Sequence, residues 1–271
     1  MKEYKKIIDQ SYELQDEEIL FFRENGFVKL KNILPAKVLD YYGQIITQKV
    51  IELNTMRLPM DERDTYQKAF LQVMNIWREN DTVKEFVMGK RLAQIATELL
   101  GTKGVRLYHD QALYKEPAGG ITPWHADQYY WPLQSEKTIT VWIPLQKPPL
   151  EMGPVAFAAG SHKFPVGRDL AISDESEITL QKAFKEMNFD HRIEPFDLGD
   201  VSFHYGWTFH HAESNNTNIP RRVMTIIYMD DQMRLKEPVN DNQKNDWESW
   251  CPGAIIGEVI NTEFNPILYH C

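Results

Sequence analysis

Two residues of metal-binding type stand two positions apart in the segment TPWHADQYYW, residues 122–131. They are His125 and Asp127, and β-branched and aromatic residues surround them. Residues i and i+2 of a strand point to the same side, so both side chains could bind one metal ion from adjacent positions. Pro123 fits the start or the edge of such a strand. The spacing alone is weak, because 8 histidines and 39 acidic residues in 271 give roughly one such match by chance.

A second match of the same type follows later in the chain, at His211-Ala-Glu213. It leads directly into SNNTNIP, a polar stretch rich in turn-forming residues. We expect a solvated pair in a loop there. The local context therefore favours His125 and Asp127 as the metal-binding pair.

A third ligand is needed, because two leave a transition metal weakly held. Two histidines and one carboxylate on one face leave three coordination positions open, which is typical of non-haem Fe(II) oxygenases. The segment DVSFHYGWTFHHAESNN offers His204, His210 and His211. Spacing alone leaves all three open as the third ligand.

An open iron site also implies a chelating co-substrate. If that molecule is a dicarboxylate, its far end needs a fixed cation, ideally an arginine that binds in a bidentate way. The segment NIPRRVMTIIYM places Arg221 and Arg222 at the start of a predicted strand. Successive strand residues face opposite sides, so only one of the two can face the site.

The first hundred residues are predicted to be mostly helical. A helix capped by Asp16 ends at Gly26, and the alternating segment FVKLKNI then predicts a half-buried strand. A second helix follows Pro35, a favourable residue in a first turn. The segment DTVKEFVMGKRLAQIATELLG predicts one more helix, which ends at Gly101.

The composition becomes rich in β-forming residues after Gly101. Short runs punctuated by Gly, Pro and Asp predict a sandwich or barrel: VRLYHDQALYKEP, KTITVWIPLQ, GPVAFAAGS, IEPFDLGDVSFHYG and RRVMTIIYMDD. Residues 167–191 are polar and resemble an insertion of the lid or substrate-loop kind, with a helix near ITLQKAFKEM.

We therefore predict one α+β domain over residues 1–271, with a mainly β core. This core, at about 101–230, is a double-stranded β-helix of the jelly-roll or cupin-like type. Helices at about 1–100 buttress it, and the segment 231–271 has no assigned role.

The composition bounds the function classes. Hydrophobic residues make up 42% and charged residues 25%, as in ordinary soluble globular proteins. The net charge of −9 argues against nucleic acid and strongly polyanionic ligands as partners. Only Cys251 and Cys271 are present, which argues against a disulfide scaffold. No window approaches ~18 consecutive apolar residues and the N-terminus lacks a signal-peptide core, so we expect a cytoplasmic protein without membrane contact.

The chain resembles the phytanoyl-CoA dioxygenase family of Fe(II)- and 2-oxoglutarate-dependent oxygenases. Four segments, from about Glu17 to Asp230 and in the family's order, carry the resemblance: FFRENGFVKL, WHADQYYWPL, GPVAFAAGSHK and GDVSFHYGWTFHHAESNNTNIPRR. Each segment is unspecific alone, and the combination is specific.

The resemblance resolves the choice of the third ligand. The family's distal pattern is His, a small residue two positions on, Asn five on, Ser or Thr seven on and Arg eleven on. Counting from His210 meets this pattern in full and ends at Arg221, whereas counting from His211 puts Asn218 at the Ser/Thr place. The resemblance thus implies His210 as the third ligand beside His125 and Asp127.

The family also implies the residues that hold 2-oxoglutarate. Arg221 matches the partner of the distal carboxylate, and Trp142 and Gln111 fall where other residues of this pocket are expected. One departure stands out: many members have Ser two positions after the distal His, and its hydroxyl helps to hold the carboxylate. This chain has Ala212 there, which lacks a hydroxyl.

The implied activity is hydroxylation of an aliphatic C–H bond in a small-molecule substrate. Its cofactors would be Fe(II), 2-oxoglutarate and O2, with succinate and CO2 as coproducts. Related halogenases lack the carboxylate ligand, so Asp127 favours hydroxylation. Clustered cations for a CoA thioester are too few, so we prefer a free metabolite. The substrate and the oligomeric state stay open.

Two rival classes keep the fold and change the function. A metal-binding jelly-roll isomerase or lyase without redox chemistry would need the metal ligands but would not need Arg221. A 2-oxoglutarate-binding sensor would keep both sets of residues and would not convert 2-oxoglutarate to succinate.

Overall fold

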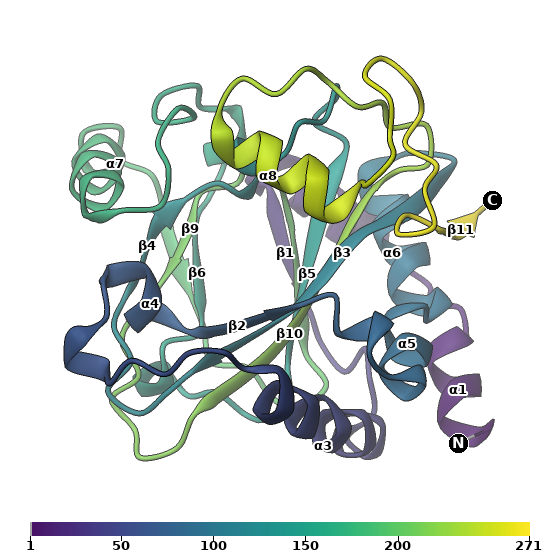
Figure 1. The fold of residues 1–271 in the computed structure, drawn as a ribbon, viewed down its shortest axis with the longest axis horizontal. Coiled ribbons are helices and arrows are strands. Elements are labelled where there is room, and N and C mark those ends of the chain that lie inside the picture. Colours follow the sequence, from purple (N-terminus) through teal and green to yellow (C-terminus); the bar gives the residue numbers. More distant parts are fainter. Residues whose placement is uncertain (1) are drawn as a thin grey trace.

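The computed structural model describes residues 2–271 as two antiparallel sheets flanked by helices (Figure 1). The α-helices are α1 (Lys2–Asp9), α2 (Asp16–Asn25), α3 (Ala36–Leu53), α4 (Thr65–Ala69), α5 (Asp81–Val87), α6 (Lys90–Leu100), α7 (Asp174–Glu186) and α8 (Asp241–Trp250). Short 3-10 turns are η1 (Met60–Glu62), η2 (Ile76–Arg78), η3 (Asp127–Tyr130), η4 (Leu150–Met152) and η5 (Ser161–Lys163).

The larger sheet has seven strands in the order β1-β8-β5-β10-β3-β11, with β2 also paired to β3. These strands are β1 (Phe27–Leu30), β2 (Leu71–Met74), β3 (Gly104–Lys115), β5 (Thr138–Pro144), β8 (Val201–Tyr205), β10 (Arg221–Asp230) and β11 (Ile267–His270). The smaller sheet has the order β4-β9-β6-β7, made of β4 (Thr122–His125), β6 (Val155–Ala158), β7 (His191–Ile193) and β9 (His210–Ala212).

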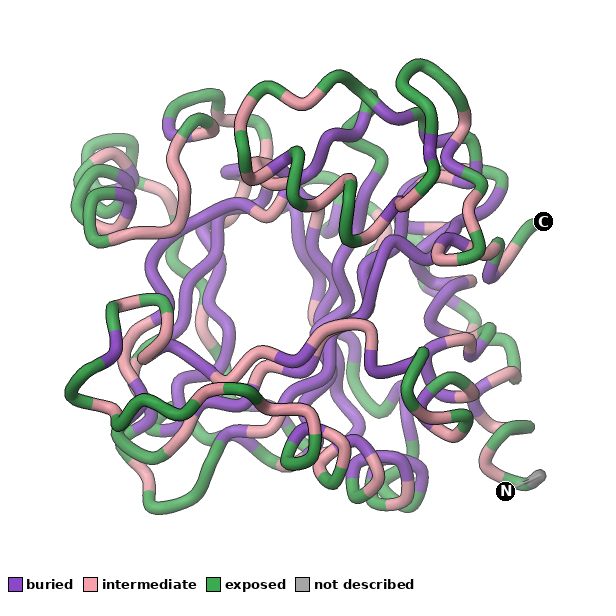
Figure 2. Tube along the Cα trace, in the orientation of Figure 1, coloured by how far each residue is buried: buried purple, intermediate pink, exposed green. Residues whose placement is uncertain are grey.

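The N-terminal helices cover one face of the larger sheet and form the main core with it. Fully buried side chains from both layers meet there, including Leu39, Ile46, Ile95, Val141 and Phe203. Figure 2 shows the strands as almost continuously buried, with exposed positions concentrated on the helices and loops. The opposite face of the larger sheet is turned toward the smaller sheet (Figure 1).

Strand register places a row of polar and aromatic residues on one face of the larger sheet. Thr225 of β10 pairs with Trp142 of β5 on one side and with Gln111 of β3 on the other. Directly paired residues point to the same side of a sheet, so these three side chains lie next to one another. Arg221 stands four positions before Thr225 on β10, and the two-residue period of a strand turns it to the same face.

The predicted fold class is confirmed, and two local predictions are wrong. The cap of α2 is Gln15 and not Asp16, because the Gln15 N–H donates to Glu18 Oε2 at 3.0 Å in a capping box. Gly26 does end this helix, in the left-handed conformation (φ 83°) that favours glycine.

The predicted helix that ends at Gly101 consists of two helices, α5 and α6. They separate at Gly89, which has an extended backbone. A Cβ at Gly89 would lie 3.1 Å from the Phe86 carbonyl oxygen and 3.2 Å from Ile8 Cβ, so α1 packs directly against the break. This tertiary contact is invisible in the local sequence pattern.

The insertion and the C-terminal segment both contain regular structure. The predicted helix of the insertion is α7, whose cap is Ser173, while the short strand β7 was not predicted. Beyond Asp230 the chain forms α8 and then β11, which pairs with β3. None of the described helices is long and apolar enough to cross a membrane.

Candidate active site

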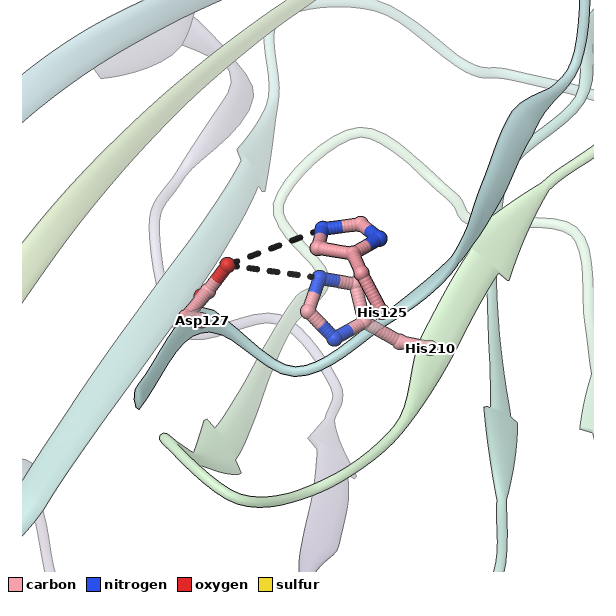
Figure 3. A group of neighbouring side chains, drawn as sticks. All are labelled: His125, Asp127 and His210. Atoms are coloured by element: carbon pink, nitrogen blue, oxygen red, sulfur yellow. Dashed lines mark ion pairs between the residues drawn. The ribbon is translucent and has the colours of Figure 1, made fainter. Parts of the chain in front are cut away.

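His125, Asp127 and His210 converge between the two sheets, although they lie far apart in the sequence. Strands β4 and β9 pair His125 directly with His210, and Asp127 follows at the first position of η3. Asp127 Oδ1 lies 3.7 Å from His125 Nε2 and 3.8 Å from His210 Nε2 (Figure 3). The three ligand atoms lie within 4.8 Å of one another, so the three side chains surround one position where a metal ion could bind.

The hydrogen bonds of the two histidines leave Nε2 of each ring free to bind a metal ion. His125 Nδ1 donates to the Pro123 carbonyl at 2.7 Å, and His210 Nδ1 donates to the Thr208 carbonyl at 3.0 Å. Each ring then carries its lone pair on Nε2, which faces Asp127. Burial lowers the pKa of both histidines to about 4, so both rings are neutral ligands at pH 7.

Asp127 is held by its second oxygen. Thr140 Oγ1 donates to Asp127 Oδ2 at 3.1 Å, and His204 Nε2 lies 3.4 Å from the same oxygen. Burial acts to raise the pKa of Asp127, but His210, His204 and His125 outweigh it and the pKa is lowered. The carboxylate is therefore an anion whose Oδ1 stays available, and the donor set of two neutral imidazoles and one carboxylate suits a divalent transition metal.

The expectation that His125 and Asp127 share a strand holds only in part. Strand β4 ends at His125, and Asp127 begins a 3-10 turn. Ala126 between them keeps an extended backbone (φ −125°, ψ 129°), so the two side chains still project to one side.

The expectation that His211 belongs to a solvated loop pair is wrong. His211 is buried in β9, where its ring stacks on Trp124 at 4.1 Å and its Nε2 lies 2.9 Å from His191 Nε2. Neighbouring residues of a strand face opposite sides, so His211 points away from Asp127 while His210 points toward it. Trp124 is turned away from Asp127 for the same reason, because it is the neighbour of His125. Of the three histidines in this segment, His204 and His210 reach Asp127 and His211 does not.

We expect His204 to act on the metal site through Asp127, because its Nε2 lies 3.4 Å from Asp127 Oδ2. Replacing His204 by phenylalanine removes one of two contacts that orient the carboxylate. We expect Fe(II) affinity to fall about 10- to 100-fold in anaerobic titrations, as is typical when such an outer partner is lost. The surface variant His270→Ala should bind iron as the wild type does. Unchanged affinity in His204→Phe would make His204 a structural residue only.

Arg221 and Arg222 face opposite sides, as strand alternation predicts. Arg222 Nε donates to Gln146 Oε1 at 2.7 Å, outside the site. Arg221 is 2% exposed and lines the same cavity as the three converging residues. Its Nη1 donates to the Gly153 carbonyl, while its buried Nε has no partner among residues 2–271. Burial lowers the pKa of Arg221 to about 9, so it remains a cation at neutral pH.

Gly153 is required for this placement of Arg221. Its backbone is left-handed (φ 65°), and a Cβ there would lie 2.1 Å from the Glu213 carbonyl oxygen. Only glycine lets the chain approach this closely and offer its carbonyl to the guanidinium.

The cavity around these residues has a volume of about 200 Å³. Trp142 and Gln111 both line it, with the Trp142 ring 5.6 Å from Arg221 Cζ and Gln72 donating to Gln111 Oε1 at 2.6 Å. Several lining residues were not predicted as part of a site: Tyr66, Phe70, Gln72, His109, Ile172, Asp246 and Trp250. Strand alternation places His109 on the same side as Gln111, whereas the segments of the other residues carry no motif that indicates a site.

Comparisons with known proteins agree with this geometry. The family model "Phytanoyl-CoA dioxygenase (PhyH)" matches residues 22–223. A relative from Stutzerimonas stutzeri named "Probable alpha-ketoglutarate-dependent hypophosphite dioxygenase" is 24% identical over 223 residues, covering 76% of each chain. The "2-aminoethylphosphonate dioxygenase" of uncultured bacterium HF130_AEPn_1 is 23% identical over 223 residues, covering 80% of this chain and 82% of that protein.

A solved structure gives the same fold. The epimerase SnoN, in complex with Fe3+, alpha ketoglutarate and nogalamycin RO, superimposes with a TM-score of 0.79 at 23% identity. The match covers 94% of this chain and 98% of that one. The likeness extends beyond Asp230 and so includes most of the C-terminal segment.

Proposed function

The chain belongs to the phytanoyl-CoA dioxygenase family of Fe(II)- and 2-oxoglutarate-dependent dioxygenases, and we propose that it hydroxylates an aliphatic C–H bond of a small-molecule metabolite. One observation carries the proposal. Two neutral imidazoles and a carboxylate share a cavity with a buried guanidinium whose Nε is unpartnered. A metal ion and a dicarboxylate would satisfy both features at once.

In this proposal His125, Asp127 and His210 hold Fe(II). Bound iron and 2-oxoglutarate together supply the oxidising power for C–H hydroxylation, with O2 consumed and succinate and CO2 released. The protein's part is to keep both imidazoles neutral by burial, to fix their tautomer and orientation through the Pro123 and Thr208 carbonyls, and to hold the carboxylate through the Thr140 hydroxyl with His204 beside it. The three metal-binding side chains are therefore already oriented toward one another before the metal binds.

Arg221 is proposed to bind the distal carboxylate of 2-oxoglutarate, with Trp142 and Gln111 as walls of the same pocket. Arg221 is held from behind by Gly153 and flanked by the Trp142 ring. A guanidinium fixed in this way loses little freedom when it binds a carboxylate. Val155 and Leu113 add apolar lining, which suits the methylene groups of the co-substrate.

Thr122 can replace the hydroxyl that Ala212 lacks. Thr122 is buried, lines the cavity and pairs directly with Ala212 across β4 and β9. Lys115 Nζ donates to Thr122 Oγ1 at 3.2 Å. Because that bond uses an acceptor position, the hydroxyl hydrogen of Thr122 is free to be donated to a carboxylate.

A valine at position 122 tests this assignment. The isosteric Thr122→Val variant should raise the Kd for 2-oxoglutarate about tenfold, as expected for one hydrogen bond to a charged group. The measurement is anaerobic calorimetric titration of the Fe(II)-loaded protein. Thr102→Val, outside the cavity, is the control and should leave the Kd unchanged. An unchanged Kd in Thr122→Val would remove Thr122 from the co-substrate site.

A free metabolite suits the cavity better than a CoA thioester. The volume of about 200 Å³ must hold co-substrate and reacting group together, which favours a small substrate. The two relatives are named for hypophosphite and 2-aminoethylphosphonate, both small molecules. Among the described residues that line the cavity, Arg221 is the only Lys or Arg, and one cation is too few for the phosphates of CoA. We also propose that the protein is cytoplasmic.

The central experiment has two steps. Fe(II) and 2-oxoglutarate are first titrated without oxygen, and a visible charge-transfer band is expected. Oxygen is then admitted with a panel of metabolites, and succinate release coupled to a product one oxygen atom heavier is expected. Succinate without oxygen in the product would favour another oxidative outcome. A missing band would favour the isomerase or lyase without redox chemistry, and a band without succinate release would favour the 2-oxoglutarate-binding sensor.

A further inference from the structure

The C-terminal segment completes the cavity through α8. This helix packs on η3, where Gln243 Nε2 donates to the Tyr129 carbonyl at 3.0 Å and Asn242 Nδ2 donates to the Tyr129 hydroxyl at 3.4 Å. In Figure 1, α8 lies across one end of the space between the sheets. Two of its side chains, Asp246 and Trp250, line the same cavity as the converging histidines.

Asp246 is a partly buried carboxylate with few partners. The Tyr108 hydroxyl donates a long hydrogen bond to Oδ2 at 3.5 Å, and Trp250 is a second hydrogen-bond partner. No Lys, Arg or His within the described residues forms an ion pair with it. His109 lines the cavity nearby and stacks on Trp250 at 4.9 Å, but burial lowers its pKa to about 4 and it carries no charge at pH 7.

The balance of charge in the cavity leaves Asp246 uncompensated. Asp127, Asp246 and Arg221 are the charged lining residues apart from histidines. If iron and 2-oxoglutarate bind as proposed, the charges of the ferrous ion and Arg221 together balance those of the co-substrate dianion and Asp127. When Asp246 is ionised, it adds one negative charge that none of the described lining residues balances. A buried charge of this kind is costly unless a ligand of opposite charge binds it.

The surroundings of Asp246 disfavour its ionised form. Burial raises the pKa of Asp246 to about 7, and neighbouring Asp127 acts in the same direction. A bound cation would favour the ionised form and lower this pKa again. A bound phosphonate or carboxylate would do the opposite, because it adds a second anion beside the first.

The walls beside Asp246 are aromatic. Tyr66, Tyr130, Trp131 and Trp250 all line the cavity. Aromatic faces attract organic cations, and a carboxylate within an aromatic enclosure is a common recognition site for ammonium groups. Charge and wall chemistry therefore point to the same kind of ligand.

We infer that Asp246 is a specificity-determining residue and that the substrate carries a positively charged amine. This inference rests on the proposed function, since it places the amine in the cavity that holds the metal and co-substrate. The C-terminal segment then has a defined role: α8 supplies the anion that selects the substrate. The reacting C–H bond lies between Asp246 and the metal ligands.

The test uses probes of one size and different charge. The full-length protein is loaded with Fe(II) and 2-oxoglutarate without oxygen, and its charge-transfer band is recorded. n-Butylamine, n-butanol, butyrate and butylphosphonate are then titrated, and binding is followed by calorimetry. Wild-type protein should bind butylamine at least about tenfold more tightly than any of the other three.

Two variants on α8 isolate the effect of the charge. Asp246→Asn keeps the shape of the side chain and should reduce the preference for butylamine at least about tenfold, while the charge-transfer band persists. Glu248→Gln changes an exposed charge on the same helix and should preserve the preference. Unfolding temperatures of the three proteins identify any variant that fails to fold, and Asp246→Ser is then used in place of Asp246→Asn.

The outcomes separate the two proposals. Loss of the charge-transfer band in the wild type would overturn the proposed function. A normal band with equal binding of butylamine and butanol, or a preference that survives in Asp246→Asn, would overturn the amine inference alone. Tighter binding of butylphosphonate would also overturn it and would direct the search toward phosphorus oxyanions.

Discussion

Replacing His210 by alanine is expected to remove high-affinity iron binding and, with it, all detectable 2-oxoglutarate turnover. His210 supplies one of three converging ligand atoms, and its Nε2 lies 3.8 Å from Asp127 Oδ1. Loss of a direct ligand should exceed the 10- to 100-fold effect that is typical of losing an outer partner, so we expect at least about a 100-fold fall in Fe(II) affinity. Anaerobic metal titration, followed by succinate release, measures both effects.

His211 provides a matched control one residue away. It is buried like His210, but its ring stacks on Trp124 and contacts His191 outside the metal site. His211→Ala should therefore lower the unfolding temperature, since it leaves a hole beside Trp124, and should keep near wild-type iron affinity. If His211→Ala loses iron while His210→Ala keeps it, the assignment of the third ligand is reversed and the family pattern misleads for this chain.

The metal-binding residues could be predicted because strand geometry and the family pattern both constrain them. Alternation of side chains places His125 and Asp127 on one side, and it survives even though Asp127 lies just beyond the strand. The choice among the three later histidines could not be made from spacing, because all three are buried and His204 also reaches Asp127. Only the family pattern favoured His210.

The substrate side of the cavity could not be predicted from local patterns. Gln72 belongs to a short strand that pairs with β3, and Asp246 belongs to a helix fixed by contacts with Tyr129. Both placements depend on tertiary packing between distant segments, which periodicity does not report. The break between α5 and α6 has the same origin, because α1 occupies the space beside Gly89.

The fold explains why the metal-binding residues could be predicted and the rest of the cavity could not. His125 and His210 lie on adjacent strands of one small sheet, where backbone hydrogen bonds fix the distance between their side chains, and Asp127 follows two residues after His125. The residues that we propose to lie near the substrate come from loops, a short strand and the C-terminal helix. Such segments vary among relatives that share a core, so they can change the substrate while the metal site persists.

Replacing Arg221 by methionine is expected to weaken 2-oxoglutarate binding about 30-fold or more, a loss of roughly 2 kcal/mol or above. The guanidinium is buried with an unpartnered Nε, so its interaction with a carboxylate is not weakened by water. Iron affinity should change little, because Arg221 is not among the three converging ligand residues. Arg221→Lys should be intermediate, since an ammonium group cannot reproduce the planar fork of arginine.

The stability of the same variant gives an independent measurement with a definite sign. Burial lowers the pKa of Arg221, so the uncompensated cation destabilises the protein without co-substrate. Arg221→Met should therefore unfold at the wild-type temperature or above it when 2-oxoglutarate is absent. Saturating 2-oxoglutarate should raise the unfolding temperature of the iron-loaded wild type and of Arg222→Met, and should leave that of Arg221→Met unchanged. An equal rise in all three proteins would show that Arg221 does not bind the co-substrate. It would favour the isomerase or lyase without redox chemistry, which does not need this arginine.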